Sequence, residues 1–199
     1  TRRFLASGAG FPDADRDEAL AFFEDALATG MLDDHRYTMA AKLGTSEGYD
    51  AGRMAATMSE FTVAKLLADA GLDFEPEVEL DSGHALDFRV RDRGTGALVE
   101  VTRPLPPARR DRANTPAQAV RETAGAKRDD QLDAHPGATL FVDCSSFDDA
   151  EWAAVATGRP AVGHEPTVVF RARPGGRIEG YRHGDLPFPL GGAVAWVGE

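Results

Sequence analysis

The sequence predicts an α/β protein in which helices flank a mixed β-sheet. Three short extended segments follow one another over residues 74–102, long helical segments lie on both sides of them, and a buried strand follows over residues 139–144. Strand pairs and long helices mixed in this order favour one sheet covered by helices. The chain has 199 residues, 42% of them hydrophobic, so it can bury a substantial core.

Residues 1–45 are expected to form an N-terminal helical extension. Asp15 and Glu18 have the spacing of a capping box at the start of a helix over residues 13–29. A second helix is expected over residues 32–43.

Residues 46–147 are expected to form the α/β core. Its first helix begins near Ser46 and stops at Gly71, a residue type that commonly ends helices. Three strands, a helix and a buried strand follow, over residues 74–80, 85–91, 97–102, 116–132 and 139–144. Pro116 suits the first turn of that helix because its missing N–H would have no partner there.

Residues 148–199 are expected to form a C-terminal extension packed on the core. A short helix and three strands are predicted over residues 148–156, 167–173, 177–182 and 193–197. Asp148 and Asp149 are of a type that caps the start of a helix.

The most informative local feature is a hairpin that brings two carboxylates face to face. A Gly-containing turn at residues 92–96 joins two short apolar strands. If Arg93 and Gly94 form the loop, Asp87 lies directly opposite Glu100, with side chains roughly 5 Å apart. Such a pair repels unless a positive group lies between its members, and a divalent cation is the natural candidate. The alternative is that both are solvated charges.

Alternation along the two strands predicts which side chains share a face. Asp87, Glu100 and Thr102 are expected on one face. The opposite, buried face is expected to carry Leu86, Phe88, Val90, Val99 and Val101.

Two helices offer further polar side chains to the carboxylate pair. Lys127 belongs to a helical stripe that is completed by Val120, Ala124 and Gln131. It is therefore expected to face inward, unless its stem only covers the edge of the core while the ammonium group stays in water. Glu60 borders the apolar stripe of the first core helix, and a plain surface acid is the alternative.

Several segments between Ser59 and Ser146 match, in order, the pattern of a known family. They are Ser59-Glu60-Phe61-Thr62-Val63-Ala64-Lys65-Leu66-Leu67, Gly71-Leu72-Asp73-Phe74, Leu86-Asp87-Phe88, Val99-Glu100-Val101-Thr102 and Leu140-Phe141-Val142-Asp143. Together they resemble the PD-(D/E)XK nuclease superfamily, which implies a restriction-endonuclease-like core. Thr102 stands where the family motif has lysine, and Lys127 in the following helix is the matching candidate.

The resemblance implies a metal-dependent mechanism. The ligands of Mg²⁺ or Mn²⁺ would be Asp87, Glu100, the Val101 carbonyl and Glu60, the last directly or through water. The metal would polarise a phosphodiester oxygen and lower the pKa of a bound water. Lys127 would orient the attacking water, and Gln131 would contact the scissile phosphate. Further substrate contacts would come from Thr102, Arg103, Arg109, Arg110 and Arg112, although the last three also suit a solvated loop.

These observations lead to three hypotheses about function. The first is metal-dependent hydrolysis of DNA, with a homodimer as a further expectation. The second is a nuclease-fold module without catalysis that binds nucleic acid or protein, because Thr102 replaces the motif lysine and the chain is acidic. The third is an unrelated α/β protein.

The charge balance bears on the environment of the protein. The net charge is −11, and lysine occurs only at positions 42, 65 and 127. Such an acidic, lysine-poor composition resembles that of halophilic archaeal proteins; a GC-rich genome is the alternative. The single cysteine suits a reducing cytoplasm. No apolar run long enough for a membrane span occurs, and the start lacks the apolar region of a signal peptide.

Overall fold

The computed structural model describes residues 51–80, 83, 85–92, 94–105, 115–173 and 177–198. The helices predicted over residues 13–29 and 32–43 lie outside this part of the chain. The elements are α4 (Ala51–Asp69), β1 (Asp73–Glu79), β2 (Ala85–Asp92), β3 (Thr95–Thr102), α5 (Pro116–Asp130), η2 (Leu132–Ala134), β4 (Thr139–Asp143), α6 (Asp149–Gly158), β5 (Thr167–Arg171), β6 (Ile178–His183), η3 (Gly191–Ala193) and β7 (Val194–Trp196). Within these ranges, no helix combines the length and the apolar character needed to cross a bilayer.

The strands form one seven-stranded sheet whose spatial order follows the chain, from β1 at one edge to β7 at the other. β1, β2 and β3 are antiparallel neighbours, whereas β3, β4 and β5 run parallel. β6 is antiparallel to β5, and β7 is parallel to β6. The predicted mixed sheet is therefore confirmed, and the segment after residue 147 extends that same sheet.

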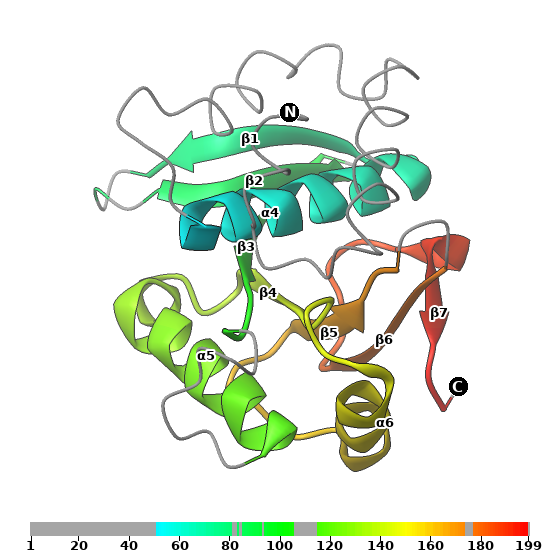
Figure 1. Cartoon of the computed structure of the whole chain (residues 1–199). Helices are drawn as coiled ribbons and strands as arrows, with labels where there is room; N and C mark the ends of the chain where they lie inside the picture. Colours follow the sequence, from blue (N-terminus) through cyan, green and yellow to red (C-terminus); the bar gives the residue numbers. More distant parts are fainter. Residues whose placement is uncertain are drawn as a thin grey trace.

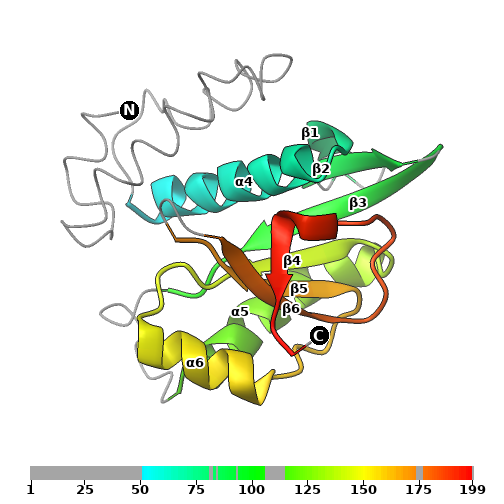
Figure 2. The same cartoon turned by 90° about the vertical axis from the view of Figure 1, so that its right-hand side faces the viewer.

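The sheet lies between α4 on one face and α5 with α6 on the other (Figures 1 and 2). α5 connects β3 to β4, and α6 connects β4 to β5. Both connections join parallel neighbours, and crossovers of this kind share one hand, so the two helices lie on the same face.

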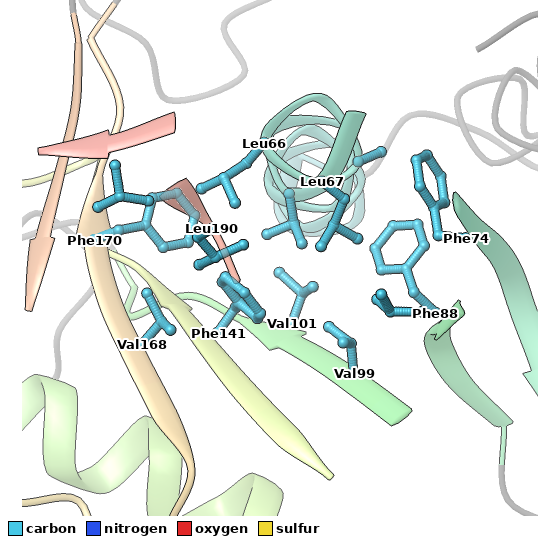
Figure 3. Packing of buried hydrophobic residues seen from close by; sticks show 14 of the residues in the cluster. Leu66, Leu67, Phe74, Phe88, Val99, Val101, Phe141, Val168, Phe170 and Leu190 are labelled. Atoms are coloured by element: carbon cyan, nitrogen blue, oxygen red, sulfur yellow. The ribbon is translucent and has the colours of Figure 1, made fainter. Parts of the chain in front are cut away.

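The core between α4 and the sheet is formed by the strand residues whose side chains point toward this helix. Leu66 and Leu67 of α4 pack against Val99 and Val101 of β3, all within one buried cluster (Figure 3). Phe74 and other aromatic side chains extend the cluster along the sheet. Each fully buried side chain of this size stabilises the fold by roughly 1.5–3 kcal/mol.

Helix α4 ends where the sequence predicts. Gly71 has a φ of +72°, a left-handed conformation that residues with a side chain rarely adopt. The N–H groups of Gly71 and Leu72 donate to the carbonyls of Ala68 and Leu67, which would otherwise lack partners at the helix end.

The opposite face is covered by α5 and α6. Val120 and Ala124 of α5 and Trp152 of α6 belong to a second buried cluster, together with Leu140 and Val142 of β4. α6 begins with a capping box between Asp148 and Glu151, which confirms the predicted cap.

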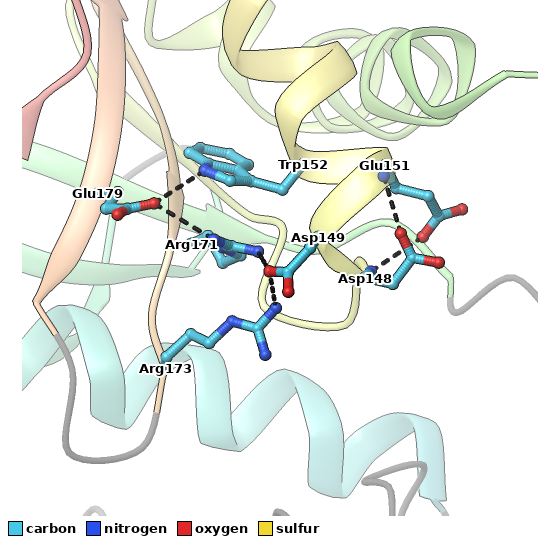
Figure 4. Close-up of polar contacts among 7 residues, drawn as sticks. All are labelled: Asp148, Asp149, Glu151, Trp152, Arg171, Arg173 and Glu179. Carbon is cyan, nitrogen blue, oxygen red and sulfur yellow. Dashed lines mark hydrogen bonds and ion pairs between the residues drawn. The ribbon is translucent and has the colours of Figure 1, made fainter.

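Arg171 at the end of β5 fastens α6 to the sheet (Figure 4). Its guanidinium donates to Asp149 of α6 at 2.8 Å and to Glu179 of β6 at 3.3 Å. It also lies 5.4 Å from the ring centroid of Trp152, whose indole N–H donates to Glu179 at 3.0 Å. Arg173 contacts the same Asp149 from the surface. The result is a polar network among β5, β6 and α6.

Candidate active site

The β2–β3 hairpin has the predicted register. Asp92 pairs with Thr95, and the pairing continues to Phe88 opposite Val99. Gly94 adopts a φ of +89° in the turn, as a tight hairpin loop requires. The paired region ends one position before Asp87 and Glu100, whose carboxyl groups still lie close enough for the Asp87 charge to act on Glu100.

At Asp87 the contact between β2 and β3 involves a side chain. Oδ2 of Asp87 accepts the main-chain N–H of Val101 at 2.8 Å, so a side chain takes the place of a main-chain partner. Leu86, one residue earlier, packs in the cluster with α5 and α6, while Phe88 packs in the α4 cluster. The prediction that Leu86 and Phe88 share one face is therefore wrong. Side chains alternate between the two faces of the sheet where β2 is paired with β3. This alternation breaks down at Asp87, where that pairing has ended.

Glu100 is a buried carboxylate on the α5 face of the sheet. Its neighbours Val99 and Val101 belong to the α4 cluster, and Glu100 itself is only 2% exposed. Oε1 of Glu100 contacts the Nζ of Lys127, whereas Oε2 is buried without a hydrogen-bond partner. The interpretation of Glu100 as a solvated strand charge is wrong, because α5 covers this face.

The environment of Glu100 raises the pKa of its carboxyl group from 4.5 to about 7. Burial is the main cause, because it disfavours the charged form, and the nearby Asp87 carboxylate acts in the same direction. Lys127 acts in the opposite direction through its charge and its hydrogen bond. A second positive charge beside this carboxylate would favour its ionised form further.

Helix α5 positions Lys127 as its stripe predicts. Thr115 caps the helix by accepting the N–H of Gln118 at 3.1 Å. Val120 and Ala124 are fully buried, and the next residue along the stripe is Lys127. Its ammonium group contacts the buried Glu100 carboxylate while the side chain stays 31% exposed, so Lys127 lies at the edge of the core and still points inward.

Gln131 links this lysine to strand β2. Its Oε1 accepts Nζ of Lys127 at 2.8 Å, and its Nε2 reaches the carbonyl of Ala85 at 3.5 Å. The structure thus brings together four of the predicted site residues, namely Asp87, Glu100, Lys127 and Gln131.

The other predicted residues lie around this group or outside the described chain. Thr102 is half-buried and lies two positions after Glu100. Arg103 turns toward α4, where it donates to the Ala55 carbonyl at 2.8 Å. Glu60 is half-buried on α4, the helix that covers the opposite face from α5, and its role as a ligand stays a prediction. Outside the described residues lie Arg109, Arg110 and Arg112.

Asp143 is a buried carboxylate that the motif analysis did not single out. It accepts the hydroxyl of Ser59 on α4 at 2.6 Å and the main-chain N–H of Ser145 at 2.8 Å. The Ser145 hydroxyl in turn accepts the N–H of Ala172 at 2.9 Å. The signal in the sequence is an acid at the end of a buried strand, directly before polar residues. These contacts satisfy Asp143 and indicate a structural role.

A hollow of about 570 Å³ lies beside Asp87, on strands β1 and β2. Its lining includes the acidic side chains of Glu75, Glu77 and Glu79 as well as Asp87. Arg89 is the basic residue of this lining, and it lies 3.8 Å from Glu75. Glu75 is also paired with Arg91 at 2.8 Å, so the excess negative charge on this side comes from the other acids of the lining.

Few side chains near Glu100 could serve as ligands of a metal ion. Among the residues that the structure describes, no three His, Cys, Asp or Glu side chains form a group that could hold a metal. The available donors are Asp87, the unpartnered Oε2 of Glu100 and main-chain carbonyls. Such a partial set suits Mg²⁺, which usually retains several waters.

Comparison with known proteins identifies a family but no activity. No curated protein and no solved structure shows significant similarity to the chain. One family model, described as a family of unknown function, DUF5784, matches residues 1–190. Since this match covers nearly the whole sequence, the chain belongs to the DUF5784 family.

Proposed function

We propose that this protein hydrolyses phosphodiester bonds in DNA with the help of a divalent cation bound beside Asp87 and Glu100. The observation that carries the proposal is the state of Glu100. It is a buried carboxylate with Lys127 on one oxygen, no partner on the other, and a second carboxylate next to it. A bound cation would satisfy the unpartnered oxygen and offset the repulsion between the two acids.

The main chain supports a third donor at the same place. The N–H of Val101 points toward Asp87, and in a β-strand the N–H and C=O of one residue point to the same side. The Val101 carbonyl therefore turns toward the β2 side as well. When bound by these oxygens, Mg²⁺ or Mn²⁺ would polarise a phosphodiester oxygen and lower the pKa of a water molecule.

The remaining residues would act on the substrate and on each other. The Lys127 side chain is 31% exposed, so its ammonium group can reach a substrate phosphate at the surface and offset the charge that develops there. Gln131 already contacts Lys127 and Ala85, which supports a role in positioning Lys127 more than a contact with phosphate.

The fold is compatible with the proposal. From α4 to β4 the order is one helix, three strands, one helix and one strand, the order that the resemblance to PD-(D/E)XK nucleases implies. This agreement supports a restriction-endonuclease-like core over residues 51–143. Lys127, which approaches Glu100 from α5, would take the place of the motif lysine that Thr102 replaces.

The test is cleavage of supercoiled and linear DNA with Mg²⁺ or Mn²⁺ at high KCl. Wild type should cut, whereas Asp87→Asn and Glu100→Gln should not. Asp92→Asn is the matched control, because it makes the same change at the far end of β2. Equal cleavage by wild type and Asp87→Asn would reject the proposal. DNA binding without cleavage in every condition would favour the alternative of an inactive nucleic-acid-binding module.

A further inference from the structure

We propose that Lys127 is a displaceable counter-ion of Glu100. In the unliganded site its ammonium group contacts both Glu100 and Gln131, and when a divalent cation binds, the ammonium group leaves Glu100 and stays on Gln131. This inference rests on the cation site of the proposed function. It concerns how the charge of the chain itself rearranges when the site is loaded.

The ion pair has one fixed and one movable member. Glu100 is 2% exposed and sits on β3, between two neighbouring strands. Lys127 is 31% exposed and carries its charge on a flexible four-carbon stem. If the pair is separated, the lysine therefore moves and the carboxylate stays.

Gln131 provides the second position for the ammonium group. Its Oε1 lies 2.8 Å from Nζ of Lys127, one helical turn further along. Its Nε2, 3.5 Å from the carbonyl of Ala85, turns the amide so that Oε1 faces the lysine. The ammonium group can thus leave Glu100 and keep a hydrogen bond.

The charges at the site favour this movement. When both are ionised, Asp87 and Glu100 carry two negative charges, and Lys127, which contacts Glu100, balances one of them. A divalent cation on Glu100 would be adjacent to the ammonium group on the same carboxylate, and two positive charges at that separation repel each other. Oε2 of Glu100, buried and without a partner, is where a cation can first bind. Loading of the site would then free Lys127 from Glu100, and the lysine, still held by Gln131, could contact the substrate.

The first test measures Mn²⁺ binding by calorimetry on the intact chain without DNA. Binding is compared at increasing pH up to about 8.5, because removal of Lys127 raises the pKa of Glu100 further and a proton on this carboxyl competes with Mn²⁺. Lys127→Met should bind Mn²⁺ about tenfold more tightly, the factor expected when a competing charged hydrogen bond is removed. Lys65→Met is the matched control, because Lys65 pairs with Asp69 on α4, and the same loss of one positive charge there should change binding less than about twofold. Glu100→Gln should abolish binding.

The second test follows the lysine itself in wild type. The chain has only three lysines, so brief acylation and mass spectrometry can report each one separately. Mg²⁺ should increase the acylation of Lys127 and leave that of Lys65 unchanged. This measurement stands even if Lys127→Met folds poorly.

Unchanged or weaker Mn²⁺ binding by a folded Lys127→Met, or Lys127 acylation that Mg²⁺ does not change, would overturn the inference. Either result could occur together with DNA cleavage, in which case the proposed function would stand without it. Absence of cation binding by both wild type and Lys127→Met would overturn the inference and the cation site together. Binding by Lys127→Met alone would support the inference strongly.

Discussion

Nζ of Lys127 on α5 contacts Oε1 of Glu100 on β3, 27 residues earlier in the chain. This contact joins the helix to the sheet and gives a buried carboxylate its only charged hydrogen-bond donor among the described residues. The nearby Asp87 carboxylate opposes the ionisation of Glu100. The stability and the proposed chemistry of this region depend on how these three charges balance.

Glu100 should make the stability of the protein depend on pH. Because its pKa is raised from 4.5 to about 7 in the folded state, the folded protein retains a proton that the unfolded chain has lost between these values. Stability from this group is therefore present below pH 4.5 and falls as the pH rises toward about 7. Relative to Glu100→Gln, wild type should lose up to about 3 kcal/mol across this window.

Urea denaturation of both proteins at pH 5 and pH 8 in the presence of a chelator checks this expectation. The difference in unfolding free energy between them should grow with pH. A difference that does not change with pH would show that Glu100 titrates normally.

Asp87 should contribute to stability through the hydrogen bond that it accepts from Val101. Asp87→Asn keeps an acceptor oxygen, whereas Asp87→Ala leaves the Val101 N–H without this partner. The alanine variant should therefore be about 1–2 kcal/mol less stable than the asparagine variant. Thermal or urea unfolding of the two variants measures this, and equal stability would mean that the hydrogen bond contributes nothing.

Arg171 should contribute far more to stability than Arg173, although both contact Asp149. The side chain of Arg171 is only 10% exposed and also contacts Glu179 and the ring of Trp152. Arg171→Ala should cost about 2 kcal/mol, because it removes a buried side chain that packs on the indole and pairs with two acids, which are themselves exposed to solvent. Arg173 is 42% exposed, so Arg173→Ala should cost less than about 1 kcal/mol. Similar losses in the two variants would contradict the structural role of Arg171.

DNA cleavage, if it occurs, should become faster as KCl increases. The lining of the hollow beside Asp87 includes Glu77 and Glu79, which repel a polyanion at low salt, whereas Glu75 is paired with Arg89 and Arg91. At about 1 M salt the screening length falls to about 3 Å, so this repulsion largely disappears. Rates measured from low to molar KCl test this, and Glu77→Gln with Glu79→Gln should reduce the salt requirement. Cleavage that falls steadily with salt would indicate that the substrate does not approach from this side.

Strand alternation and turn chemistry determined much of the hairpin. The register that pairs Asp92 with Thr95 follows from a short loop with Gly94 at positive φ, and both are local properties of the sequence. The stripe that directs Lys127 inward follows in the same way from helical spacing. The prediction failed at Leu86, because alternation describes a regular strand and β2 departs from the β3 ladder at Asp87.

The sequence by itself determined the mixed sheet flanked by helices, the hairpin register and the inward direction of Lys127, because each depends on residues that are close in the chain. Only the tertiary structure decided that Glu100 is buried, that Lys127 reaches it and that Gln131 holds the lysine from the other side. These contacts depend on the face of the sheet that α5 covers and on how far along the strands it lies. The face that α5 covers and its position along the strands are set by how helices and strands pack together, and neither can be derived from the residues of one segment.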